Sequence, residues 1–243
     1  MMGLDTADAV LGRFARDLDR EGQLDSSTLR PDLSRATPAD IEAAQVAWSS
    51  RVLGEYRGVV IYTELLALLA EAEAPYVALC AVQRIIGDEL RHTRLCAAVV
   101  EQLGGWESIE LDLGGQRMPR WDGPPAGRAL EVVARELVVV EQASVLSFRA
   151  HLRAVEDPAI RSVFERLLAD EVRHAAAGVA LQNLLERHYP DEQLRESRAR
   201  LASRLAGDRD HLREQAWARA TDGPGRALGA SLRRSDLEGL YDA

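Results

Sequence analysis

The feature that most constrains the fold of this chain is a five-residue motif that occurs twice. Asp-Glu-Leu-Arg-His occupies residues 88–92, and Asp-Glu-Val-Arg-His occupies residues 170–174. Both copies lie in long segments whose apolar residues recur every three or four positions, a spacing typical of amphipathic helices. Because residues three apart share one face of a helix, each copy presents its glutamate and its histidine side by side.

The composition favours helix over the whole chain. Alanine, leucine, arginine and glutamate dominate, aromatic residues make up only 5 %, and no segment alternates apolar and polar residues for long enough to predict a strand. The 243 residues are enough for one domain with a complete hydrophobic core. We therefore expect an all-α protein whose single domain spans residues 1–243.

The apolar periodicity predicts a core of four long helices within residues 38–188. Thr37 and Pro38 are a good helix start, since a capping hydroxyl precedes proline at the first helical position. The predicted core helices span approximately residues 38–74, 76–103, 126–156 and 158–188.

The remaining segments are predicted to connect or surround these four helices. Residues 104–126 are rich in glycine and proline, and we expect them to form a long crossover between the second and third helices. Residues 1–37 predict a peripheral helix followed by a loop. Residues 191–243 are highly charged with few apolar positions, which predicts outer helices lying against the bundle.

Net charge and cysteine content limit the classes of function. The formal net charge of −9 disfavours tight binding to nucleic acids or anionic membranes. The sequence contains no run of about 18 apolar residues, so we expect no membrane span, and no secretory signal is recognisable. Cys80 and Cys96 fall about 24 Å apart on one predicted helix, too far for a disulfide. We expect a cytoplasmic protein.

Two further glutamates interrupt apolar helix faces. Glu55 lies in the stripe of the first helix, and Glu141 lies in that of the third. A carboxylate in such a stripe is costly unless it is paired or bound to a metal. Glu64 and Glu136 are the competing candidates on the same helices, and a salt bridge to a neighbouring arginine is the alternative role for Glu55 and Glu141.

The distances along the chain favour Glu141 and Glu55. In an antiparallel hairpin, residues equally far from the turn lie at the same height. The second motif is centred about 15 residues after the turn at 157–158, and Glu141 lies about 16 residues before it, whereas Glu136 misses by about five. The first motif lies about 16 residues after the turn at 74–75, and Glu55 lies about 19 before it, against about 10 for Glu64.

These residues predict a two-metal site. A Glu-x-x-His pair from each of two helices, with one glutamate from each of two more, is the ligand set of di-iron four-helix bundles. Oxygen and imidazole donors suit iron or manganese, whereas structural zinc sites usually contain cysteine. We expect two iron ions, or a manganese–iron pair, bound by Glu55, Glu89, His92, Glu141, Glu171 and His174.

This pattern resembles the ferritin-like di-iron carboxylate superfamily. The doubled motif resembles that of the bacterial multicomponent monooxygenases, and it is similar to that of the acyl desaturases and the ribonucleotide reductase small subunit. The resemblance covers roughly residues 45–188 and implies a ferritin-like four-helix bundle. It also implies that Asp88 and Asp170 accept hydrogen bonds from the ring N–H of the histidine ligands, and that Arg91 and Arg173 pair with those aspartates. Plain ion pairs three residues apart are the alternative.

The resemblance implies a type of reaction but does not identify the substrate. The chain lacks the extra helices of the large monooxygenases and a rubredoxin-like tail, and it is more similar to small stand-alone members such as N-oxygenases and hydroxylases. We expect a non-haem di-iron oxidase or oxygenase that uses O2 and an electron donor or reductase to oxidise a small organic substrate, with no catalytic residue beyond the metal ligands. A ferroxidase, a rubrerythrin-like peroxide-scavenging protein and a non-catalytic metal-binding bundle are the alternatives, and a homodimer stays open.

Several other residues have the chemistry for a role near this site but are predicted to serve elsewhere. Cys96, Tyr62 and Trp48 lie on the same stripes and are interpreted as core residues, with electron transfer as the alternative for the two aromatic side chains. His151 and His211 are predicted to lie on the surface.

Overall fold

The computed structural model of the chain describes residues 29–105, 121–220 and 222–240. Helices make up most of these residues and no strand occurs among them, so the all-α prediction is confirmed. The helix predicted near the N-terminus and most of the predicted crossover lie outside the described residues.

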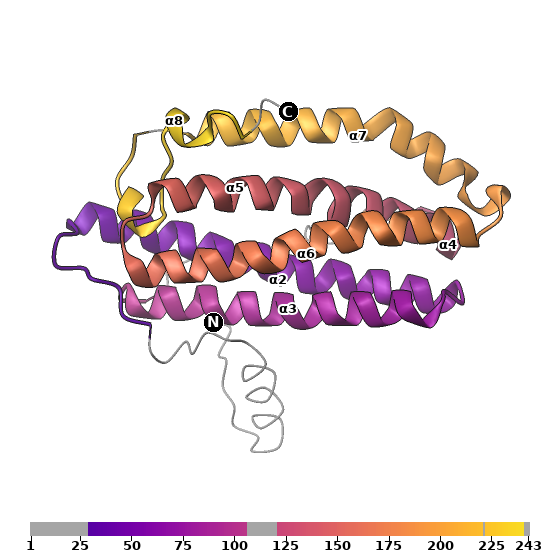
Figure 1. Cartoon of the computed structure of the whole chain (residues 1–243), viewed down its shortest axis with the longest axis horizontal. Helices are drawn as coiled ribbons and strands as arrows, with labels where there is room; N and C mark the ends of the chain where they lie inside the picture. Colours follow the sequence, from indigo (N-terminus) through magenta and orange to yellow (C-terminus); the bar gives the residue numbers. More distant parts are fainter. Residues whose placement is uncertain (1–28, 106–120, 221, 241–243) are drawn as a thin grey trace, which may run out of the picture.

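Long helices lie side by side as a bundle (Figure 1). Two of them, α2 (Pro38–Glu71) and α3 (Tyr76–Gln102), pack along each other as one pair. The third predicted helix consists of three consecutive sections, α4 (Pro125–Val132), η2 (Val133–Val140) and α5 (Glu141–Ala154). Its partner is α6 (Pro158–His188), which packs against both η2 and α5.

The helix starts follow from the capping residues that the sequence provides. The Thr37 side chain accepts a hydrogen bond from the backbone N–H of Asp40, whose carboxylate in turn accepts one from the backbone N–H of Thr37. Asp157 caps α6 by accepting from the backbone N–H of Ile160. Gly104 follows α3 with a φ of 106°, the positive value that favours glycine after a helix end.

The apolar core consists mainly of two clusters, one toward each end of the bundle. One cluster packs the last turns of α2 against the first turns of α3, with α4, η2 and the last turns of α6. The other packs the first half of α2 against the last turns of α3, with the end of α5 and the start of α6. Between them, each of these helices carries charged residues on its inner face, and both copies of the repeated motif lie there.

The η2 section departs from the predicted continuous α-helix. It is a π-helix, in which each N–H bonds to the carbonyl five residues earlier, as the bond from Glu141 N to Glu136 O illustrates. The same section lies very close to α6, because a Cβ atom at Gly178 would be only 2.6 Å from the carbonyl oxygen of Leu137. Packing against α6 therefore accompanies the altered hydrogen bonding, and apolar periodicity alone does not reveal it.

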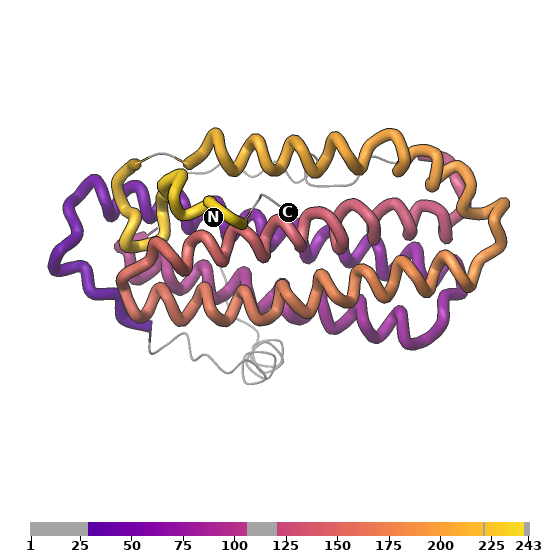
Figure 2. Tube along the Cα trace, turned by 45° about the horizontal axis from the view of Figure 1, so that its top comes forward, coloured from indigo at the N-terminus to yellow at the C-terminus, as the bar shows by residue number. Residues whose placement is uncertain are grey.

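Helix α7 (Asp191–Arg219) lies on the outside of the bundle, as predicted (Figure 2). It is held by ion pairs to buried or half-buried residues of the third helical stretch. Arg200 Nε lies 3.0 Å from Glu131 of α4, and Arg135 Nε of η2 lies 2.8 Å from Asp208. The α7 helix thus covers the side of the bundle formed by α4, η2 and α5.

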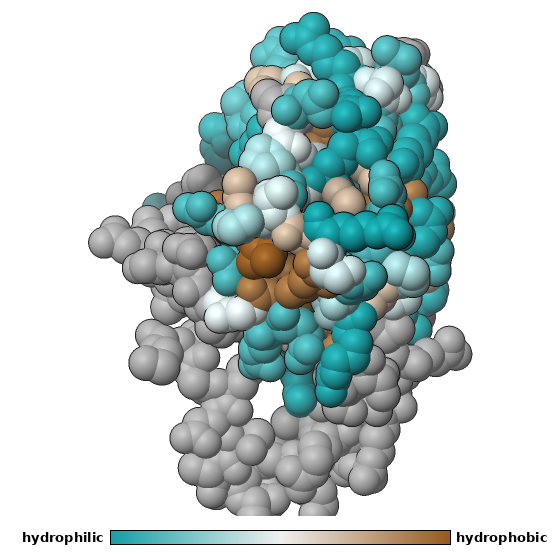
Figure 3. Space-filling model, turned by 90° about the vertical axis from the view of Figure 1, so that its left-hand side faces the viewer, coloured by the Kyte–Doolittle hydropathy of each residue, from teal (hydrophilic) through white to brown (hydrophobic). Residues whose placement is uncertain are grey.

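The chain finishes with two short helical turns, η3 (Arg226–Leu228) and α8 (Arg234–Leu237). Arg226 joins them through an ion pair of 2.7 Å to Asp236. The face of the molecule near this region is mostly hydrophilic, with a small apolar area (Figure 3). None of the helices in the described ranges has both the length and the apolar content of a membrane span.

Candidate metal centre

Four helices bring the six predicted metal-binding side chains together in the interior. Helix α2 contributes Glu55 and α5 contributes Glu141, while α3 and α6 each contribute the glutamate and histidine of one motif. All six side chains are buried, and the most exposed, Glu55, retains only 8 % of its accessible surface. The site is therefore shielded from bulk water. Charge interactions within it are stronger than they would be in water.

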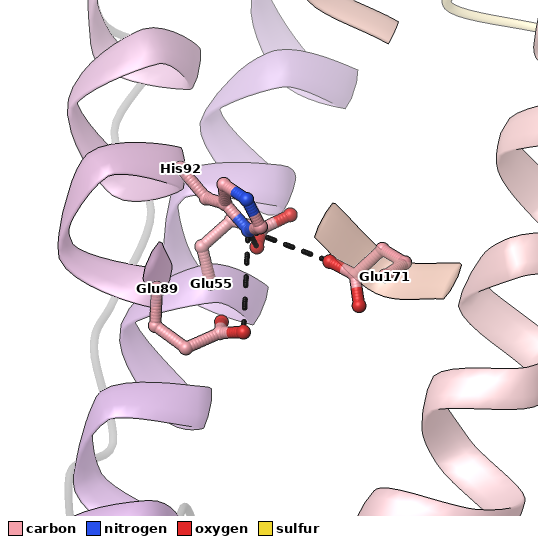
Figure 4. Close-up of side chains that lie close together, drawn as sticks. All are labelled: Glu55, Glu89, His92 and Glu171. Carbon is pink, nitrogen blue, oxygen red and sulfur yellow. Dashed lines mark hydrogen bonds and ion pairs between the residues drawn. The ribbon is translucent and has the colours of Figure 1, made fainter. Parts of the chain in front are cut away.

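These side chains form two overlapping groups of possible metal ligands. One group comprises Glu55, Glu89, His92 and Glu171, and Figure 4 shows Glu171 reaching toward the other three. The second comprises Glu89, Glu141, Glu171 and His174. In each group one donor atom per residue can be chosen so that all four lie within 4.8 Å of one another. Glu89 and Glu171 belong to both groups, so the two groups share half of their members.

Both histidines direct the same ring nitrogen toward the carboxylates. His92 Nδ1 lies 3.2 Å from Glu55 Oε2 and 3.4 Å from Glu171 Oε1. His174 Nδ1 lies 3.3 Å from Glu89 Oε1 and 3.5 Å from Glu171 Oε2. The two halves of the site therefore have the same arrangement, as the repeated motif leads one to expect.

The other ring nitrogens contact aspartates, and the contacts cross between the motifs. His92 Nε2 lies 3.2 Å from Asp170 Oδ2, and His174 Nε2 lies 3.3 Å from Asp88 Oδ2. The resemblance implied aspartate acceptors for both histidines, and in the structure each motif supplies the acceptor for the other. Such carboxylate–histidine pairs orient an imidazole and fix which nitrogen is available to a metal.

Arginines surround these two aspartates. Arg91 contacts Asp88 and Arg173 contacts Asp170, as the resemblance implied. A further arginine one turn earlier on each helix adds a second ion pair: Arg84 lies 3.4 Å from Asp88 and Arg166 lies 3.0 Å from Asp170. Each aspartate that faces an imidazole is therefore also in contact with two guanidinium groups.

The competing glutamates lie outside the two groups. Glu136 is buried and forms two hydrogen bonds with Arg57, at 2.9 and 3.1 Å. The guanidinium compensates the charge of this carboxylate. Glu64 is half-buried and belongs to neither group. By contrast, within the described part of the chain neither Glu55 nor Glu141 forms a salt bridge with an arginine or lysine, so the alternative role considered for them is not observed.

Tyr62, which the sequence favours as a core residue with electron transfer as the alternative, contacts the site directly. Its hydroxyl donates a hydrogen bond to Glu141 Oε1. Burial, together with Glu141 and Glu89, raises the pKa of Tyr62 well above its usual value, so the phenol stays protonated as a donor. Its place seven residues after Glu55, two helical turns along the same stripe, was the available signal. Cys96 and Trp48 lie in the apolar core, as interpreted.

The metal-free cluster holds more negative charge than a buried site tolerates. Burial, with Glu171 and Glu55 nearby, raises the pKa of Glu89 to about 7. Burial and the adjacent Glu171 raise the pKa of Glu141 well above its usual range. Burial lowers the pKa of His174, but the close carboxylates of Glu171 and Glu89 outweigh it and raise that pKa to about 9. Protons thus partly neutralise the cluster, a role that metal cations can take over.

The arrangement fits divalent metal ions. Glu89 Oε1, Glu171 Oε2 and His174 Nδ1 are buried and lack a hydrogen-bond partner among the described residues, as expected of atoms that bind a metal. Gly58 on α2 leaves room for the Glu89 carboxylate, because a Cβ atom there would collide with it. Buried carboxylates and imidazoles are the donors that iron and manganese accept.

A cavity of about 700 Å³ adjoins the cluster. It lies between α2, the η2–α5 stretch and α7, with residues 230–237 closing part of its wall. Four of the site carboxylates border it: Glu55, Glu89, Glu141 and Glu171. A molecule in this cavity would contact the cluster directly.

The fold and the site define an all-helical protein with a buried carboxylate–histidine cluster that could hold a metal. We find no match to this chain among protein-family models, curated proteins or solved structures. Its function must therefore be argued from the geometry of the cluster and of the adjoining cavity.

Proposed function

We propose that this protein is a ferritin-like non-haem di-iron oxidase or oxygenase that oxidises a small organic molecule with O2. The observation that carries the proposal is the cavity of about 700 Å³ bordered by four carboxylates of the cluster. A cavity of this volume lies within the range of small-molecule sites. A centre that only stored or oxidised iron would need no such space, and this favours the organic substrate over the ferroxidase alternative.

Two iron ions would be held by the two ligand groups, with Glu89 and Glu171 common to both. When bound, such a pair supplies the O2 chemistry and the redox equivalents that amino-acid side chains lack. An electron donor or reductase would return the electrons that each cycle consumes.

The protein's own residues orient the metal-binding side chains and exclude water from the site. Asp170 and Asp88 fix the imidazoles so that Nδ1 faces the carboxylates. Tyr62 holds Glu141 by its hydrogen bond and keeps the phenolic proton on its own oxygen. The two apolar clusters on either side of the site keep bulk water away, so that charges there are weakly screened.

Iron stoichiometry and O2 uptake test the proposal. Metal-free protein would be loaded anaerobically with Fe(II), freed of excess iron, analysed for bound iron and then mixed with O2. We expect about two irons per chain, and uptake of O2 that is lost in Glu171→Ala and His174→Ala. Glu165→Ala, which changes an exposed glutamate of the same helix, is the matched control.

Two outcomes would overturn the proposal. Iron binding in Glu171→Ala and His174→Ala equal to that of the unaltered chain would show that the cluster is not the iron site. Catalytic oxidation of many equivalents of free Fe(II) per chain would instead indicate a ferroxidase.

A further inference from the structure

The charged residues that border the cavity are unevenly distributed. Its carboxylates are the four site glutamates and Glu136, and Glu136 is already paired with Arg57. The remaining formal charges on the wall are two arginines, Arg51 of α2 and Arg219 of α7. Neither has a carboxylate within 4.0 Å among the described residues. The wall of the cavity thus carries two arginines without a paired carboxylate in addition to the acidic cluster.

Arg51 is held rigidly by groups that do not neutralise it. Its guanidinium carbon lies 4.6 Å from the Trp48 ring centroid and 5.0 Å from that of Phe164. One nitrogen donates to the carbonyl oxygen of Gly229 at 2.7 Å and also contacts His151 Nε2. Aromatic faces and a carbonyl orient a guanidinium, but they do not supply the negative charge that a buried cation requires.

His151 lies beside Arg51, and its position corrects the prediction that it lies on the surface. It retains only 7 % of its accessible surface, and its ring stands edge-on to Phe164 with centroids 4.9 Å apart. Burial and the neighbouring Arg51 lower its pKa well below the usual value, so the ring is neutral. Because Nε2 accepts from Arg51, the ring proton resides on Nδ1.

Two buried donors at this place lack partners within the described ranges. They are Nη1 of Arg51 and Nδ1 of His151. Leaving buried donors unpaired is costly, so unpaired donors in adjacent residues point to a group that is not part of the chain. An anion at Nη1 of Arg51 would accept from that donor and would also compensate the guanidinium charge.

The position of Arg51 relates this group to the metal site. It precedes Glu55 by four residues on α2, which is about one helical turn or 6 Å. Apolar residues also border the cavity, among them Ile61, Val140 and Phe148. A molecule whose anionic end lies at Arg51 would therefore place its apolar part along the wall that leads to the carboxylates.

We propose that the cavity binds a small organic carboxylate, with its carboxylate group held by Arg51, which His151 helps to position, and its apolar part directed toward the cluster. This proposal deepens the function proposed above, because it names the substrate class of that site. A single guanidinium without a paired carboxylate matches the single charge of a carboxylate, and its planar fork suits the two oxygens. The binding step itself needs no metal.

Binding to the metal-free full-length protein tests this inference. Hexanoate and its uncharged counterpart hexanamide would be titrated by calorimetry in the presence of a chelator, so that coordination to a metal cannot contribute. We expect hexanoate to bind about tenfold more tightly or better, since a charge-assisted pair contributes on the order of that factor. The preference should fall to about one in Arg51→Gln and be partly retained in Arg51→Lys.

The controls separate binding from folding and from the metal chemistry. Arg149→Gln removes an exposed arginine of α5 and should keep the full preference for hexanoate. Circular dichroism and thermal unfolding check that Arg51→Gln stays folded, and His151→Gln, which removes a contact that positions the Arg51 guanidinium, should lower the preference in part. Equal binding of acid and amide to the unaltered chain, absence of binding by either, or an unchanged preference in folded Arg51→Gln would overturn the inference. Because no metal is present, these results are independent of the iron-loading test.

Discussion

His92 of α3 and Asp170 of α6 are joined across the bundle, with 3.2 Å between Nε2 and Oδ2. The reciprocal contact joins His174 to Asp88. Each copy of the repeated motif thus contributes a histidine that the aspartate of the other copy orients. The two motifs form one unit, and damage to either aspartate should affect the half of the site that the opposite helix supplies.

We expect Asp170→Asn to weaken metal binding about 10- to 100-fold, the usual effect of losing a partner of a ligating histidine. The amide can no longer hold the His92 ring by charge. Competition with a metal-binding dye measures the affinity. Asp191→Asn is the control, because it removes an exposed aspartate whose partner, Arg198, is also at the surface. An Asp170→Asn affinity equal to that of the control would rule out the orienting role.

Gly58→Ala should disable the centre without altering any ligand. The new methyl group would collide with the Glu89 carboxylate, which then has to leave its place between the two ligand groups. We expect less than half the normal iron content, measured by elemental analysis after anaerobic loading. Gly54→Ala on the same helix meets nothing within 4 Å, so it should retain full iron content and gain about 1 kcal/mol in stability from helix propensity. Similar iron content in both variants would contradict this account of Gly58.

Gly178→Ala should lower the free energy of unfolding by about 1–3 kcal/mol, the usual cost of overpacking. A Cβ atom there would lie 2.6 Å from the carbonyl oxygen of Leu137, and backbone atoms yield less readily than a flexible side chain. Urea denaturation measures the change. Gly207→Ala in α7, where no atom lies within 4 Å, should be neutral or stabilising. If Gly178→Ala proved as stable as Gly207→Ala, α6 and η2 would be less closely packed than described.

Metal affinity should rise with pH between about 6 and 9. A histidine must lose its ring proton from Nδ1 to bind a metal, and the pKa of His174 is raised to about 9 by its carboxylate neighbours. Glu89, with a pKa of about 7, adds a second proton that competes with the metal. Protonated groups thus oppose binding at low pH, and the competition fades as pH rises through these values. Mn(II) titrations at several pH values, with proton release followed by calorimetry in two buffers, measure this. An affinity independent of pH would show that the cluster is already deprotonated.

The helices and the candidate ligands could be predicted because they depend on local patterns. Apolar periodicity located the long helices, and counting residues from the turns favoured Glu141 over Glu136 and Glu55 over Glu64. The structure places the favoured pair in the cluster. Such counting works because the rise per residue of a helix is constant.

Other features depend on which surfaces meet, and local patterns do not reveal them. The exchange of aspartates between motifs requires α3 and α6 to approach with their motifs at one height. His151 was predicted to be exposed, yet the ring packs against Phe164, a residue of the next helix. The π-helical form of η2 likewise depends on how α6 packs against it.

The η2 section has a consequence for how this protein can change by insertion or deletion. A π-helical stretch accommodates one more residue than the α-helix it interrupts, and each residue of an α-helix turns the chain by about 100°. Loss of a single codon within residues 133–140 would therefore let this section return to α-helix while Glu141 keeps its orientation relative to α4. The same loss from an unbroken α-helix would turn the following carboxylate away from the other ligands. This short buried segment thus tolerates a change of one residue in length that the neighbouring α-helices would not.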